Sequence, residues 1–196
     1  MGMKRETYER KFRDLFAEVI DLVDGEVQQW REHQIEVRKN QVTPDEFIYV
    51  VEWQGRALNA FALDFHKIAG GHPYIILHYD HHSVVISQLP RKPSNKEMEL
   101  NSCRDFLISF IRSTIISEAK KVALQQGFFA TIKGSSLFII VGSHIFRLDY
   151  WVGLNSWEVR CETAPKVLWT TYYCGNQHPL EFLPFLLKSL ALKVLL

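Results

Sequence analysis

The sequence lacks an excess of charge of either sign. Its 23 Lys and Arg residues nearly balance 22 Asp and Glu residues, so the formal net charge is +1. A chain with this balance has no overall field that would attract it to a phosphate backbone or to an anionic membrane surface. The net charge therefore gives no reason to expect a nucleic-acid partner, although it does not exclude one.

A long hydrophobic run is also missing. The longest apolar stretch, 180–196, is short and carries Lys188 and Lys193, whereas a membrane-spanning helix needs about 20 predominantly apolar residues. The first residues, MGMKRETYERKF, contain no apolar core of the kind that a secretory leader has. We therefore expect no membrane partner and a soluble, intracellular protein of the cytoplasm.

Cysteine is scarce, and the three residues Cys103, Cys161 and Cys174 form no CxxC pair. This pattern argues against a disulfide framework or a zinc knuckle, and it favours a reducing compartment. Cys103 falls on the apolar face of a predicted helix, which indicates a core thiol rather than a nucleophile. The GxSxG, GxGxxG, HExxH and P-loop motifs are absent as well. We predict no cofactor and lean against an enzyme.

The residues that are present are typical of a globular protein. The 196 residues are 47% hydrophobic and 23% charged, which allows a sizeable core. Residues 5–24 predict an amphipathic helix. At about 100° per residue, one stripe holds Tyr8, Phe12, Leu15, Val19 and Val23. Asp24-Gly25 would end or kink this helix, whereas Trp30 would rejoin the stripe if the helix continued.

Two hairpins are predicted next. FIYVVEW (47–53) and RALNAFALDFHK (56–67) flank Gln54-Gly55, a turn at which glycine accepts a positive φ. Alternation would place Phe61, Leu63 and Phe65 on one face of the second strand, and Ala60, Ala62, Asp64 and His66 on the other. YIILHY and HSVVISQL form the second hairpin around Asp80-His81.

The second half of the chain follows a similar order. After the loop LPRKPSNK, Ser94 and Glu97 form a capping box and predict a helix that runs to Gln126 and stops at Gly127. Its apolar middle, FLISFIRSTII, predicts burial between layers. About five strands follow, namely FFATIK, SLFIIV, HIFRLDYWV, SWEVRCE and KVLWTTYY. A last helix begins at about Pro179, so the predicted order is helix, four strands, long helix, five strands, helix.

These elements predict an α+β fold with largely antiparallel sheets and three main helices, in a single compact domain over 1–196. Two short similarities suggest an internal repeat. FRDLF (12–16) resembles CRDFL (103–107), and AFALDF (60–65) resembles HIFRLDY (144–150). A repeat would divide the chain into two pseudo-repeated helix-plus-meander halves, 1–92 and 93–196.

Five of the eight histidines fall within 66–82, a density that raises the question of a metal site. A metal needs three or four donors about 2 Å from one point. A two-residue turn at Asp80-His81 would instead send His78 and His82 to opposite faces of the hairpin. Polar residues are also what tight turns prefer, so the clustering alone predicts no metal.

The strongest metal candidate joins Asp64 and His66, which share a strand face, to His78 or His82. His72 lies in a GGHP loop that could approach them. Two donors on one strand are a common coincidence, because carboxylate and imidazole groups are frequent on solvated strand faces. We therefore assign no metal or catalytic residues and keep these four side chains, Asp64, His66, His78 and His82, as candidates.

Other residue patterns allow further chemistry but do not favour it. Asp64 and Asp149 stand in aromatic sequence, yet alternation turns both away from their neighbours and predicts solvated carboxylates. Asp149 followed by Glu158 and Arg160 resembles a nuclease pattern with Arg in place of Lys, and Arg cannot release a proton near neutrality. On the strands, stacking surfaces for nucleic acid could come from Trp53, Trp151, Trp157 and Trp169.

The last helix carries two apolar faces. Leu183, Leu187, Leu190 and Val194 form a stripe that should dock on the body of the protein. Phe185, Leu192 and Leu196 fall on the other side, beside Lys188 and Ser189. Large apolar residues on the wet face of a helix often mark an interaction surface. They are our candidates for partner binding.

The sequence thus favours a non-enzymatic protein-interaction module, such as an accessory subunit, adaptor or inhibitor in a larger assembly. Its partner would be another protein or a second copy of the chain. The alternative is a metal-dependent hydrolase or nuclease that uses the Asp64/His66/His78–His82 region. A nucleic-acid-binding subunit ranks third, because no RNA-binding signature accompanies the tryptophans.

Overall fold

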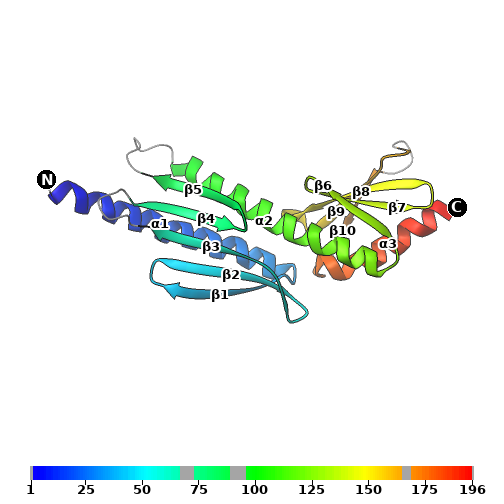
Figure 1. The fold of residues 1–196 in the computed structure, drawn as a ribbon, viewed down its shortest axis with the longest axis horizontal. Helices are drawn as coiled ribbons and strands as arrows, with labels where there is room; N and C mark the ends of the chain where they lie inside the picture. The colour runs from blue at the N-terminus through cyan, green and yellow to red at the C-terminus, as the bar shows by residue number, and fades with distance from the viewer. Residues whose placement is uncertain (1, 67–72, 89–95, 165–168, 196) are drawn as a thin grey trace. The chain divides into compact units, whose positions relative to one another are not determined.

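The computed structural model describes residues 2–66, 73–88, 96–164 and 169–195. Within these ranges, three α-helices are combined with ten β-strands in two five-stranded antiparallel sheets (Figure 1). The chain divides into two compact units. Unit 1 holds residues 1–31 and 36–110, and unit 2 holds residues 32–35 and 111–196.

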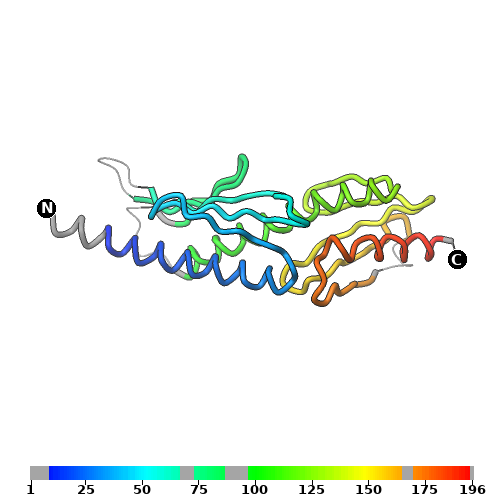
Figure 2. The backbone as a smooth tube through the Cα atoms, turned by 90° about the horizontal axis from the view of Figure 1, so that it is seen from below, coloured from blue at the N-terminus to red at the C-terminus, as the bar shows by residue number. Residues whose placement is uncertain are grey.

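Unit 1 starts with helix α1 (Gly2–Glu32), which leads into a meander of five strands. The strands are β1 (Glu36–Thr43), β2 (Glu46–Trp53), β3 (Arg56–His66), β4 (Tyr74–Tyr79) and β5 (His82–Gln88). They lie side by side in chain order, so each strand pairs only with its neighbours in sequence. Figures 1 and 2 show α1 and the first part of α2 (Lys96–Gln125) on the same face of this sheet.

Aromatic rings form the centre of the unit 1 core. The ring centroid of Phe61, on β3, lies 4.9 Å from that of Phe110 on α2 and 4.8 Å from that of Tyr49 on β2. The ring of Trp30, on α1, lies 6.5 Å from both Phe61 and Phe110. All four side chains are buried. Because large rings contribute most of the buried area in a core, these contacts fix which face each element turns inward.

Helix α1 continues straight through Gly25 rather than ending there. Its buried stripe consists of Phe12, Phe16, Val19, Val23, Val27 and Trp30. Val27 and Trp30 extend the stripe beyond the glycine, and their burial outweighs the cost of a glycine in a helix interior. The sequence prediction of a helix over 5–24 was therefore too short, and the side chain of Tyr8 lies outside the described residues.

Unit 2 has its own antiparallel sheet, in the order β10-β9-β8-β7-β6. Its strands are β6 (Phe129–Lys133), β7 (Ser136–Val141), β8 (His144–Trp151), β9 (Ser156–Cys161) and β10 (Trp169–Tyr173). A short 3-10 turn, Val152–Leu154, joins β8 to β9, and helix α3 (Pro179–Leu195) follows β10. The second part of α2 also belongs to this unit.

The unit 2 core follows the alternation of its strands. Cross-strand partners on the inner face include Leu137 with Leu148 and Tyr150 with Trp157, all buried. Helix α3 packs on this face, because the indole Nε1 of Trp157 donates a hydrogen bond to the carbonyl oxygen of Pro179 at 3.2 Å. Lys193 near the end of the helix also donates to a tyrosine hydroxyl of β10 at 2.9 Å.

The α+β class, the three helices and the antiparallel sheets are confirmed. The turns predicted at Gln54-Gly55 and Asp80-His81 are also found, and Gly127 ends α2 with a φ of 84°. The prediction of four strands before the long helix was wrong because β1 was not expected. The capping residue Ser94 lies outside the described residues. Three further expectations stay predictions: a single domain over 1–196, the halves 1–92 and 93–196, and the internal repeat.

No helix in the described part of the chain combines the length and the apolar composition that crossing a membrane requires.

Candidate functional site

The β4–β5 hairpin places the clustered histidines as its predicted register requires. Tyr79 pairs with His82, and His78 pairs with Ser83. Asp80, in the turn, has a φ of 49°, a left-handed conformation that Asp tolerates better than most residues. The ring of His82 lies tilted beside that of Tyr79, with the centroids 5.2 Å apart, on the face that the helices cover. His78 and His82 therefore lie on opposite faces and do not converge.

Two of the other metal-site candidates, His66 and His78, lie beside Asp64 on the face of the sheet opposite the helices. The Oδ2 atom of Asp64 lies 2.6 Å from Nε2 of His78 and 3.7 Å from Nε2 of His66. The Asp64 side chain is 11% exposed, so the prediction of a solvated Asp64 was wrong. The cause is its place on β3, the central strand, where a short side chain lies beneath longer side chains of its neighbours.

The other carboxylate oxygen of Asp64, Oδ1, is buried and has no hydrogen-bond partner among the described residues. Such an atom costs free energy because it has lost its water. Even so, no group of three or more His, Cys, Asp and Glu side chains in the described residues is arranged to hold a metal. The 2.6 Å separation is a hydrogen-bond length, whereas two ligands of one zinc ion stand roughly 3 Å apart. His72 lies outside the described residues.

The two carboxylates of the nuclease-like pattern, Asp149 and Glu158, lie next to each other, but each is paired with an arginine. Asp149 and Glu158 are direct cross-strand partners on β8 and β9. Each forms an ion pair along its own strand, Asp149 with Arg147 at 2.9 Å and Glu158 with Arg160 at 2.6 Å. Ser136 also donates a hydrogen bond to Asp149. Since both carboxylates are held by guanidinium groups, the arrangement is that of paired charges on a sheet face.

The tryptophans do not form one stacking surface. Trp157 is fully buried in the core of unit 2, so its predicted availability for stacking was wrong. Trp151 is half exposed, and the guanidinium of Arg112 lies 5.5 Å above its ring. Trp53 is half-buried, and the side chain of Trp169 lies outside the described part of the chain.

Helix α3 presents the two faces that its sequence predicts. Leu183, Leu187 and Leu190 are fully buried and Val194 is half-buried, so the docking stripe is confirmed for its three leucines. On the other side, Phe185 is 64% exposed and Leu192 is 63% exposed. Phe182 joins them, since its ring lies 5.6 Å from that of Phe185. Phe182, Phe185 and Leu192 are called the α3 outer stripe here, while Leu196 lies outside the described residues.

Sequence reasoning missed Asn155, which organises the approach to α3. Asn155 is 1% exposed and has a φ of 41°. Its side-chain amide donates to the carbonyl oxygens of Gly175 and Gln177 at 2.9 Å, and its Oδ1 accepts from the hydroxyl of Tyr150 at 2.9 Å. The tendency of Asn to adopt left-handed turns was the only signal that could have pointed to this residue.

His178, just before α3, was missed as well. Its Nδ1 accepts a hydrogen bond from the backbone N–H of Leu180 at 3.1 Å and so caps the helix, whose first residue is Pro179. Burial lowers the pKa of His178 to about 4. The imidazole is therefore neutral at pH 7, and it can accept the capping hydrogen bond only in that form.

The buried thiols are unsuited to nucleophilic chemistry. Burial raises the pKa of Cys103 to about 12, and the same cause raises the pKa of Cys174 to about 12. Both side chains are inaccessible in the described chain. The interpretation of Cys103 as a core thiol rests on this burial and on the weak nucleophilicity of a protonated thiol.

Comparison with known proteins does not identify a function for these residues. The sequence matches no protein-family model, and it matches no curated protein. The fold and the site define an α+β protein of two antiparallel meanders, each with a face covered by helices. Its most distinctive side chains are the Asp64–His78 pair of unit 1 and the α3 outer stripe of unit 2.

Proposed function

We propose that this protein is a non-enzymatic protein-interaction module, such as an accessory subunit, adaptor or inhibitor in a larger assembly. The exposure of Phe185 and Leu192 carries the proposal. The opposite face of α3 already buries its leucines, so folding does not need these two side chains to be apolar. Clustered exposed apolar residues of this kind often mark an interaction surface.

The chemistry of the α3 outer stripe favours a groove-type contact with a protein. Phe182, Phe185 and Leu192 recur at the spacing i, i+3 and i+10, which aligns them along one side of a helix. Helices that bind in this way insert such anchors into an apolar groove of the partner. Lys188 is exposed beside them, which favours a partner with an acidic residue at the rim of its groove.

The test is the double variant Phe185→Glu/Leu192→Glu. We expect it to keep the thermal stability of the parent and to lose the proteins that co-purify with the parent from an extract. A matched control places the same charges on exposed apolar residues elsewhere, in Val42→Glu/Leu124→Glu, and should keep those partners. Unfolding of the first variant would assign its residues to the core, and unchanged co-purification would place the contact elsewhere.

A metal-dependent hydrolase is the second candidate, and the convergence of His66 and His78 on Asp64 favours it. It ranks second because the described residues offer no group of three donors arranged for a metal. Elemental analysis of the purified protein discriminates between the two proposals. Stoichiometric zinc, manganese or iron that is lost in Asp64→Asn would favour the hydrolase, whereas metal-free protein would reject it.

A further inference from the structure

Strand β5 forms one edge of the unit 1 sheet, because it pairs only with β4 among the described residues (Figure 1). The pair Tyr79–His82 flanks a two-residue turn, so these residues bond to each other and the ladder alternates from there. Val84 therefore bonds to β4, whereas Ser83 and Val85 turn their backbone N–H and C=O groups outward. No backbone group elsewhere in the described chain bonds to these two residues.

The sequence of β5 does not protect this edge. Natural edge strands usually carry charged residues or proline, which discourage pairing with another chain. The opposite edge, β1, carries Glu36, Arg38 and Lys39, whereas β5 (HSVVISQ) contains no Lys, Arg, Asp, Glu or Pro. The register of β5 shifts between Val85 and Ser87. Because a bulge interrupts regular pairing, the open ladder is confined to the part of β5 before it and suits a short strand.

A groove of about 410 Å3 lies between β5 and the flank of α2. Its apolar part consists of Val84 and the rings of Tyr79 and Phe106, whose centroids are 5.4 Å apart. Successive side chains of a strand point to opposite faces of a sheet, so a strand added to β5 would direct every second side chain to the face on which α2 lies. The groove therefore complements an extended chain with apolar residues at alternate positions.

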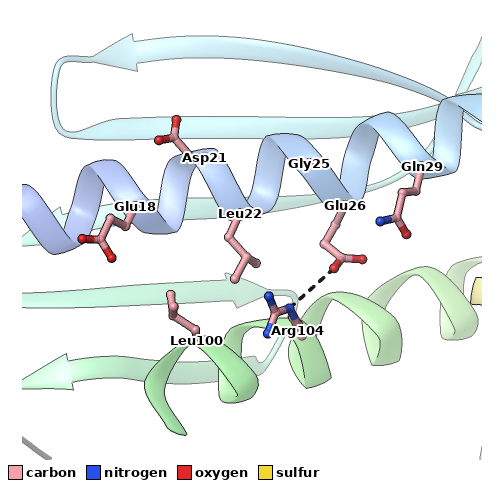
Figure 3. Close-up of a pocket in the computed structure, with 8 residues that line it drawn as sticks. All are labelled: Glu18, Asp21, Leu22, Gly25, Glu26, Gln29, Leu100 and Arg104. Carbon is pink, nitrogen blue, oxygen red and sulfur yellow. Dashed lines mark ion pairs between the residues drawn. The ribbon is translucent and has the colours of Figure 1, made fainter. Parts of the chain in front are cut away.

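The opposite flank of α2 packs against α1, which holds α2 in place beside β5. Figure 3 shows Leu22 of α1 and Leu100 of α2 pointing toward one another. Glu26 and Arg104 form an ion pair at 3.9 Å between the same two helices. Both walls of the groove are thus positioned before a partner binds, and such preorganisation lowers the entropic cost of binding.

We propose that the β5 edge binds an extended segment of another protein, which adds one more antiparallel strand to the unit 1 sheet and places apolar side chains in the groove beside α2. Strand addition to an open edge is a common mode of peptide recognition, in which backbone hydrogen bonds supply affinity and side-chain pockets supply specificity. The antiparallel direction continues the pairing of all five strands.

A second copy of the chain fits this edge less well than a peptide segment. Pairing of two β5 strands would also bring the flanks of two α2 helices together, and this flank is polar, with Ser102, Asp105 and Ser109. Burial of polar groups is unfavourable unless they find hydrogen-bond partners. The edge lies in unit 1, so this inference goes beyond the α3 outer stripe and does not depend on it.

The probe is a short fluorescein-labelled peptide in which Thr and Val alternate between terminal Lys residues, and fluorescence anisotropy measures its binding to the full chain. With the Val side chains in the groove, the amides of the Thr residues face β5. N-methylation of every Thr should weaken binding about tenfold or more, because it removes backbone hydrogen bonds. N-methylation of every Val changes only amides that point away from β5, so this matched probe should bind like the unmodified peptide.

The amides of the two valines report on the edge directly. In a chain carrying isotope-labelled valine, Val85 should exchange its amide proton faster than Val84, and the probe should slow the exchange of Val85. Val85→Pro removes the outward N–H at a position where an edge strand tolerates proline, so it should keep the circular dichroism spectrum of the parent and lose the probe. The control Val85→Thr keeps the N–H and the β-branched shape and should bind normally. If Val85→Pro does not fold, the methylated probes still test the same hydrogen bonds in the parent.

The proposal is overturned if the probe does not bind the parent, if N-methylation of Thr weakens binding no more than that of Val, or if the Val85 amide of the free chain is as protected as that of Val84. The last result would mean that another segment of the chain covers the edge. A dimeric parent and a monomeric Val85→Pro variant in light scattering would assign the edge to a second copy and would also overturn it. Phe185→Glu/Leu192→Glu should bind the probe normally, which separates failure here from failure of the proposed function.

Discussion

Asn155 stabilises the protein through both its backbone conformation and its side-chain hydrogen bonds. It adopts a left-handed conformation that favours Asn and Gly, and its buried side chain makes three hydrogen bonds. We expect Asn155→Ala to lower the free energy of unfolding by about 3 kcal/mol or more, because it leaves buried polar groups without partners and adds backbone strain. Urea denaturation at pH 7 measures this loss.

Two further variants separate the causes. Asn155→Gly keeps the left-handed conformation but removes the hydrogen bonds, so it should lose somewhat less stability than Asn155→Ala. Tyr150→Phe removes only the hydroxyl that donates to Asn155 and should cost about 1 kcal/mol. If Asn155→Ala were as stable as the parent, the loop before α3 would not depend on this side chain.

His178 should make the stability of the protein depend on pH. Its pKa is about 4 in the folded protein because of burial, against about 6.5 in an unfolded chain. Between these values the unfolded state binds a proton that the folded state does not, so the free energy of unfolding falls as pH falls. The contribution is complete above about pH 6.5 and is progressively lost toward pH 4. From pH 7 to pH 5 it amounts to about 2 kcal/mol.

The measurement compares urea denaturation of the parent and His178→Asn at pH 7 and pH 5. Asn keeps a side-chain oxygen that can cap α3, but it does not titrate in this range. The parent should therefore lose more stability than the variant on acidification. Equal losses in the two proteins would show that other groups set the acid response.

At the scale of elements, α1 is stabilised by packing rather than by its local sequence. Its buried stripe runs on both sides of Gly25, whose position has space for a side chain. We expect Gly25→Ala to raise the free energy of unfolding by about 1 kcal/mol, because alanine is the better helix former and meets no steric obstacle. Chemical denaturation of both proteins measures the change. A destabilised variant would mean that the helix bends or packs more tightly at this position.

Element prediction succeeded where the sequence carries a clear period. The hairpins at Gln54-Gly55 and Asp80-His81 combine alternating apolar residues with a recognisable turn, and their registers are found as expected. Strand β1 (EVRKNQVT) buries only Val37, so it lacks the alternation that identifies a strand. It forms because β2 offers it a hydrogen-bonding edge, and pairing of this kind is not encoded in local composition.

The candidate site was less predictable than the elements, because its geometry depends on contacts between strands. Alternation correctly separated His78 from His82 and placed Asp64 with His66. It could not predict that Asp64 would be buried, since burial comes from neighbouring strands and not from the period of β3 itself. Asn155 was missed for a similar reason, because its partners are 5 to 22 positions away across turns. The cap that His178 forms is local, two positions from Leu180, but histidine is not among the residues that usually cap helices.

At the scale of the whole molecule, the two units share one helix. Phe110, the last residue of unit 1, lies in the middle of α2, and the remainder of that helix belongs to unit 2. We expect Phe110→Ala to cost about 3–5 kcal/mol and Leu148→Ala, in the core of unit 2, about 2–5 kcal/mol. If 1–196 is a single domain, each substitution should shift one common unfolding transition.

Guanidinium denaturation followed by far-UV circular dichroism and by tryptophan fluorescence measures both effects. Coincident curves in both variants would support a single domain. A variant that unfolds in two steps, with only one step shifted by its substitution, would show that the units unfold independently and would contradict that prediction.

The shared helix has a consequence for how the chain is made. Among the described residues, every strand of both sheets pairs only with a sequence neighbour. This local connectivity favours rapid folding and suits a chain that emerges from the ribosome one residue at a time. The meander of unit 1 is complete in sequence at Gln88, yet Phe106 and Phe110, which fill its core, are synthesised later. A nascent chain paused between these points would carry an open aromatic interior, so this interval of translation is where we expect the protein to need a chaperone.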